Sequence, residues 1–107
     1  MGAAAIAGLG AVALSAVASH MAMAPAANVM LRDAVQMQGW HALAMLFAGQ
    51  TRARLAGIAF LVGMVGFCVP IYALVFFAMK FTFIAPYGGT TLMLGWALLG
   101  LAALKRR

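Results

Sequence analysis

Five polar side chains interrupt the apolar stretches of this sequence and are its main candidates for chemistry: His20, Gln38, His41, Tyr72 and Thr90. Gln38 and His41 are three residues apart, a spacing that puts both on one face of a helix. Such groups can hydrogen-bond one another, hold a quinone headgroup or, in the case of the imidazoles, bind a metal. If the surrounding segments lie in a membrane, an unsatisfied polar group is costly, so we expect these side chains to bond one another in one cluster.

A second pattern, HMAM, combines an imidazole with two thioethers, which are ligands that suit cuprous copper. The chain has nine methionines, and methionine is also an ordinary filler of apolar packing. We therefore predict no metal site and keep His20, Met21 and Met23 only as copper candidates. Two histidines could ligate haem, but the sequence has no covalent attachment motif.

Catalytic chemistry lacks its usual groups. The whole chain contains one acidic residue, Asp33. It therefore offers no pair of carboxylates for acid and base catalysis, and a serine or cysteine triad would lack an acidic partner. We predict that the protein is not an enzyme.

The composition is that of a membrane protein, because 67% of the residues are hydrophobic and 7% are charged, against about one quarter charged in soluble domains. A helix needs about 20 apolar residues to cross a bilayer. Charge-free runs cover residues 1–31, 34–51, 55–79 and 81–104. We predict an all-α integral membrane four-helix bundle, a single transmembrane domain over residues 1–107 with helices at about 3–23, 34–49, 55–79 and 86–104.

Prolines set several of these boundaries. Pro25 should end the first helix, which leaves residues 26–33 as a connection and makes the second helix short for a bilayer. Pro70 lies in the middle of the third helix and should kink it, because proline has no amide hydrogen to donate. Pro86 has the fixed φ that favours the first turn of the fourth helix.

Small residues predict where helices pack. Lipid is as apolar as leucine, so close backbone approach and polar bonds drive the association of membrane helices. A stripe with a spacing of four runs along the first helix: Ala7, Ala11, Ser15 and Ser19. Gly88 and Gly89 permit the same close approach at the start of the fourth helix.

The basic residues, which give a net charge of +6, lie at the ends of the hydrophobic runs. Their expected partners are lipid headgroups and not nucleic acid. Arg52, Arg54 and the tail residues 105–107 flank one side, and Arg32 and Lys80 flank the other, so five positive charges stand against two. The positive-inside rule then places both termini in the cytoplasm, N-in and C-in, with the polar cluster in the outer half of the membrane. We predict a multi-pass protein of the bacterial inner membrane, with an organellar inner membrane as the alternative.

Several motifs resemble a known family. The segment IAPYGGTTLMLGWALLGLAAL has the proline, glycine pair and Gly-Trp of the small four-helix membrane proteins typified by bacterial YgdD, a family of unknown function with a mitochondrial counterpart. GWHALAML, FCVPIY and SAVASH are similar to further family elements. The resemblance covers nearly the whole chain and adds Gly95 and Trp96 to the packing residues. The chain departs from the family pattern at Ser19, Val69 and Pro70.

The expected function is non-catalytic. With almost no mass outside its helices, the chain fits a small accessory or assembly subunit of a larger membrane complex, of a respiratory or other electron-transfer kind, whose other subunits would be its partners. Two alternatives stay open. One is a membrane-embedded protein that binds a quinone, a lipid or a metal at the polar cluster, although no cofactor is our prediction. The other is a small transporter.

Overall fold

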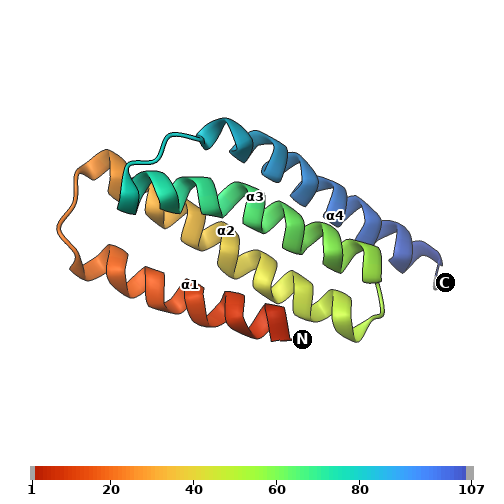
Figure 1. Cartoon of the computed structure of the whole chain (residues 1–107). Coiled ribbons are helices and arrows are strands. Elements are labelled where there is room, and N and C mark those ends of the chain that lie inside the picture. The colour runs from red at the N-terminus through yellow and green to blue at the C-terminus, as the bar shows by residue number, and fades with distance from the viewer. Residues whose placement is uncertain (1, 106–107) are drawn as a thin grey trace.

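The computed structural model describes residues 2–105 and confirms the all-α class. Its elements are α1 (Gly2–His20), α2 (Pro25–Gln50), α3 (Arg54–Phe77), the 3-10 helix η1 (Thr82–Ile84) and α4 (Ala85–Lys105) (Figure 1). Arg106 and Arg107, which contribute two of the charges in the topology prediction, lie outside the described residues.

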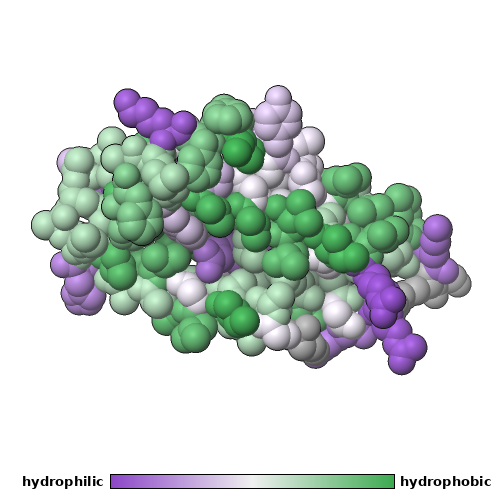
Figure 2. Space-filling view, viewed as in Figure 1, coloured by the Kyte–Doolittle hydropathy of each residue, from purple (hydrophilic) through white to green (hydrophobic). Residues whose placement is uncertain are grey.

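Three helical segments are long and apolar enough to cross a membrane: Gly2–His20, Arg54–Phe77 and Thr82–Lys105. α2 is longer, at 26 residues, but is not among them. Its first turns carry Asn28, Arg32 and Asp33, which lower its apolar character. Figure 2 shows hydrophobic residues over much of the middle of the molecule and the most strongly hydrophilic ones mainly toward its two ends. Long apolar helices and a hydrophobic middle between hydrophilic ends are features of a membrane protein.

The second helix begins at Pro25, so the prediction of a connection over residues 26–33 is wrong. Proline fits the first helical position, where its missing amide hydrogen has no partner within the helix to lose. A proline after an apolar run can therefore start a helix as readily as end one. The connection is only residues 21–24, because α1 ends at His20. α2 is thus not the short helix that we expected.

Each helix packs chiefly against the next one along the chain: α1 against α2, α2 against α3, and α3 against α4. Figure 1 shows successive helices running in opposite directions, with the α2–α3 turn and both ends of the chain toward the same end of the molecule. α1 and α4 lie on opposite sides of the α2–α3 pair. The predicted bundle is therefore open, because α1 and α4 do not close it by packing on each other.

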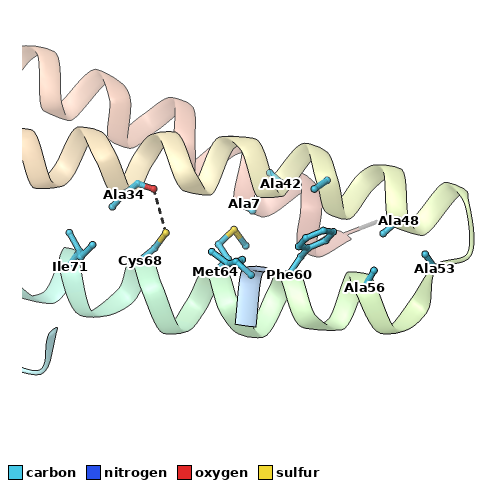
Figure 3. Close-up of a cluster of buried hydrophobic side chains, with 12 residues drawn as sticks. Ala7, Ala34, Ala42, Ala48, Ala53, Ala56, Phe60, Met64, Cys68 and Ile71 are labelled. Atoms are coloured by element: carbon cyan, nitrogen blue, oxygen red, sulfur yellow. Dashed lines mark hydrogen bonds between the residues drawn. The ribbon is translucent and has the colours of Figure 1, made fainter. Parts of the chain in front are cut away.

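The largest part of the core lies between α2 and α3. Phe60, Met64 and Cys68 project from α3 toward α2, and the Cys68 thiol donates a hydrogen bond to the carbonyl oxygen of Ala34 at 3.4 Å (Figure 3). Phe60 is completely buried. α3 continues through Pro70, which is buried within the helix, and the kink expected there stays a prediction.

Glycines bring the backbones of α3 and α4 into contact. A Cβ added to Gly88 would collide with the backbones of Gly66 and Phe67 and would lie 2.8 Å from the carbonyl oxygen of Gly63. On Gly63, an added Cβ would lie 2.8 Å from the backbone nitrogen of Leu92. The two helices can approach this closely only because these positions lack side chains.

The other predicted packing residues of α4 differ in how tightly they are held. A Cβ on Gly95 would lie 2.7 Å from Cδ1 of Phe60, so this glycine leaves room for the buried ring. A Cβ on Gly89 would meet only Cδ1 of Phe67, at an ordinary 3.8 Å. Trp96 is half exposed.

The stripe predicted on α1 is only partly in the interface. Ala7 and Ala11 are buried, but Ser15 and Ser19 are exposed. A spacing of four advances about 40° beyond a full helical turn, so a stripe of this kind winds away from a neighbouring helix. A stripe that alternates spacings of three and four, or uses seven, stays on one side of the helix. The buried residues of α1 follow this pattern: Ala4, Ala7, Ala11 and Ala18.

Candidate functional site

Gln38 forms the centre of one polar group and joins three helices. Its amide Nε2 donates a hydrogen bond to the carbonyl oxygen of Ala7 in α1 at 2.8 Å. Its Oε1 accepts one from the hydroxyl of Tyr72 in α3 at 2.7 Å. Gly10 leaves room for the amide, since a Cβ at that position would lie 2.9 Å from Nε2. The buried glutamine therefore has both ends of its amide bonded.

His41 forms a second polar group with both ring nitrogens in hydrogen bonds. Nδ1 lies 2.7 Å from the carbonyl oxygen of Met37, and Nε2 lies 3.1 Å from Nε1 of Trp96. A carbonyl can only accept and an indole can only donate, so Nδ1 carries the hydrogen and Nε2 the lone pair. The ring is therefore neutral in this arrangement, and its one lone pair is already used.

An aromatic cluster surrounds this histidine. The ring centroids of His41 and Phe60 are 5.6 Å apart, those of His41 and Trp96 are 5.9 Å apart, and those of Phe60 and Trp96 are 5.1 Å apart. All three pairs are strongly inclined, which is a favoured arrangement for aromatic rings. Because the residues come from α2, α3 and α4, the cluster ties these helices together.

The structure divides the predicted polar cluster. It brings Tyr72 to Gln38, but the partner of His41 is Trp96, which the sequence analysis had assigned only to packing. His20 is exposed at the end of α1. Thr90 is also exposed, and its hydroxyl donates to the carbonyl oxygen of Pro86, one turn earlier in its own helix, at 2.8 Å. A threonine can satisfy its hydroxyl within its own helix and needs no partner from a neighbour.

The position of His41 along its helix differs from the prediction. With α2 starting at Pro25, His41 lies nearer to the end of this helix at Gln50 than to its start. The expected placement in the outer half assumed a helix that begins near residue 34. The correction of the helix start therefore moves His41 toward the end of the molecule that holds the α2–α3 turn.

The three copper candidates lie at the end of α1 and in the connection that follows it. The copper candidates His20 and Met21 are exposed at the end of α1, and Met23 is half-buried in the connection. Residues 2–105 contain no group of three or more His, Cys, Asp or Glu side chains that could hold a metal ion.

A polar contact at the end of α1 was not predicted from the sequence. Asn28 Nδ2 and Arg32 Nη2 donate to the carbonyl oxygen of Ala18 at 2.8 and 3.3 Å, and Arg32 Nε donates to Asn28 Oδ1 at 2.7 Å. The last carbonyls of a helix have no partner within it and carry the negative end of its dipole, so a cation is favourable there. The four-residue spacing of Asn28 and Arg32 could have predicted their contact. That spacing brings two side chains together only in a helix, and this segment was expected to be a connection.

The chain was also compared with known proteins. Residues 7–89 match the model of a family described as a protein of unknown function, DUF423. The chain belongs to the DUF423 family. Neither a curated protein nor a solved structure matches it. The part of this DUF423 protein that matches holds Gln38, His41 and Tyr72, whereas Trp96 lies beyond it. The resemblance to YgdD-type proteins is compatible with this membership.

Proposed function

We propose that the protein is a non-catalytic, four-span subunit that assists or assembles a larger complex in the bacterial inner membrane, with both termini in the cytoplasm. An electron-transfer complex, such as a respiratory one, is the class of partner that we favour. The three membrane-capable helices support the location. α2 would be the fourth span, since its 26 residues amount to about 39 Å of helix.

The open arrangement of the helices is the observation that carries this proposal. α1 and α4 each pack chiefly against one neighbour, so both edges of the molecule offer a helix face to another subunit. Exposed apolar side chains cover these faces, among them Ile6, Leu9 and Val12 on α1 and Met93 and Leu101 on α4. Among residues 2–105, little lies outside the helices in which a catalytic or recognition site could be built.

The hydrogen bonds favour a structural role for the polar residues. Every buried side-chain nitrogen or oxygen among residues 2–105 has a hydrogen-bond partner. Both ring nitrogens of His41 and both ends of the Gln38 amide already have partners, so a metal on the His41 ring would have to displace an existing bond. Binding of such a ligand and transport therefore rank below a subunit role.

Purification from native membranes in a mild detergent tests the proposal. We expect a second membrane protein to co-purify in a fixed ratio, and haem or flavin absorption in that material would identify an electron-transfer complex. A photoreactive residue introduced at Leu9 and, separately, at Met93 should show which edge contacts the partner. A chain that migrates alone and gives no cross-link from either edge would contradict the proposal.

A further inference from the structure

Two apolar grooves meet at the end of the molecule that holds the α2–α3 turn. The first is a cavity of about 620 Å³ between α1, α2 and α3, lined by apolar residues such as Met45, Ile58 and Leu61. The second, of about 340 Å³, lies between the start of α3 and the end of α4 and includes Leu98 and Leu101. The grooves have three lining residues in common: Arg52, Ala53 and Arg54.

Both arginines at this junction are exposed. The arginine side-chain hydrogen bonds found within residues 2–105 belong to Arg32, near the start of α2. The carbonyl oxygens of Phe47, Ala48 and Gly49 at the end of α2 accept from the backbone N–H groups of Thr51, Ala53 and Arg52, respectively. Lys105 adds a third positive charge beside the second groove.

Among residues 2–105 no acidic side chain balances this local charge, because the one acidic residue, Asp33, lies near the start of α2. α3 begins at Arg54 with no side-chain cap and no acidic residue in its first turn. A cation at the positive end of a helix dipole is unfavourable unless an anion lies nearby. The shared rim of the two grooves thus favours a negative group, while their walls favour hydrocarbon.

We propose that this end of the molecule binds an anionic glycerophospholipid. Its phosphate lies between Arg52 and Arg54, and its two acyl chains occupy the two grooves. Basic pockets between membrane helices on the cytoplasmic side are suited to such headgroups, and the proposed topology puts the α2–α3 turn on that side. The inference rests on the membrane location in the proposed function and not on the subunit role.

Native mass spectrometry of the full chain in detergent, with phosphatidylglycerol or phosphatidylcholine added, tests this site. We expect the wild type to retain phosphatidylglycerol preferentially. Each basic residue near an anionic surface contributes enough for about a fivefold change in affinity, so Arg52→Gln with Arg54→Gln should weaken retention about 25-fold. Lys80→Gln is the matched control, because Lys80 is an exposed cation in the α3–η1 connection at the opposite end.

Three results would overturn the proposal: no preference for the anionic lipid, an equal loss in Lys80→Gln, or displacement of the lipid by the same concentration of its soluble deacylated headgroup. The last would show that a phosphate alone suffices and that the grooves take no part. Failure of the subunit proposal is distinguishable, since a chain that purifies without a protein partner can still retain phosphatidylglycerol. A chain absent from the membrane fraction would overturn both.

Discussion

The α3–α4 contact and the α1–α2 contact join neighbouring helices by different means. Between α3 and α4, Gly63, Gly66 and Gly88 remove the side chains that would keep the two backbones apart. Between α1 and α2, polar side chains of α2 donate to carbonyl oxygens of α1, at Ala7 and at Ala18. The α3–α4 contact therefore depends on glycines that have no side chain. The α1–α2 contact depends on a few hydrogen-bond donors of α2.

This difference predicts unequal tolerance to substitution. A backbone contact cannot shift to accept a methyl group, because both helices are rigid where they touch. A hydrogen bond between membrane helices contributes about 0.6 kcal/mol on average, so the fold should tolerate the loss of one. We therefore expect the α3–α4 contact to be the more sensitive of the two.

Gly88→Ala should have the largest effect. The added methyl group has no space against the backbone of α3, and we expect a loss of about 3 kcal/mol or more in the free energy of unfolding. Titration with a denaturing detergent, followed by circular dichroism, measures it. Gly89→Ala is the matched control, because its added Cβ meets only a side-chain carbon at 3.8 Å. Equal stability of the two variants would refute the backbone contact.

Gln38→Leu should be next in size. It leaves the Tyr72 hydroxyl without its acceptor and removes the bond to Ala7, so we expect a loss of about 1 to 2 kcal/mol in the same titration. Tyr72→Phe removes one bond of the two and should cost about 0.6 kcal/mol. If Tyr72→Phe cost as much as Gln38→Leu, the bond to Ala7 would contribute nothing.

Gly10→Ala sharpens the comparison within α1. Its methyl group would lie 2.9 Å from Gln38 Nε2, so the amide must move and its bond to Ala7 should weaken, at a cost of about 1 kcal/mol. Gly8→Ala is the control, because no other atom lies within 4 Å of its added Cβ, and alanine is the better helix former. Gly8→Ala should therefore be neutral or stabilising, and a loss in both variants would contradict this assignment.

The smallest effect is expected from Ser15→Ala combined with Ser19→Ala. Both side chains are exposed on α1, so the unfolding free energy should change by less than about 0.5 kcal/mol. A larger loss would show that the predicted four-residue stripe does pack on another helix, in this chain or in a partner.

The sequence predicted the helices better than their contacts. Long apolar runs show where helices are, but Pro25 is ambiguous, since the same residue can end one helix or begin the next. That single boundary changed the expected position of His41 along its helix. Gly88 could be found because it is paired with Gly89 after Pro86, whereas Gly63 and Gly66 are separate glycines in a uniformly apolar helix without a visible period.

The polar contacts show a similar limit. Gln38 and Tyr72 were expected in one cluster because buried polar groups need partners, and they do bond each other. Nothing in the sequence pairs His41 with Trp96, which is 55 residues away, because an indole is as ordinary in a lipid-facing position as in an interface. The apolar composition around His41 indicates that its ring needs a hydrogen-bond partner. Which residue is the partner depends on how α4 packs.

An open row of helices has two faces but no lumen. A solute that crosses a membrane through protein needs walls on all sides, and α1 and α4 do not pack on each other to complete one. A pathway lined by all four helices would therefore need a second copy or another protein to complete its wall.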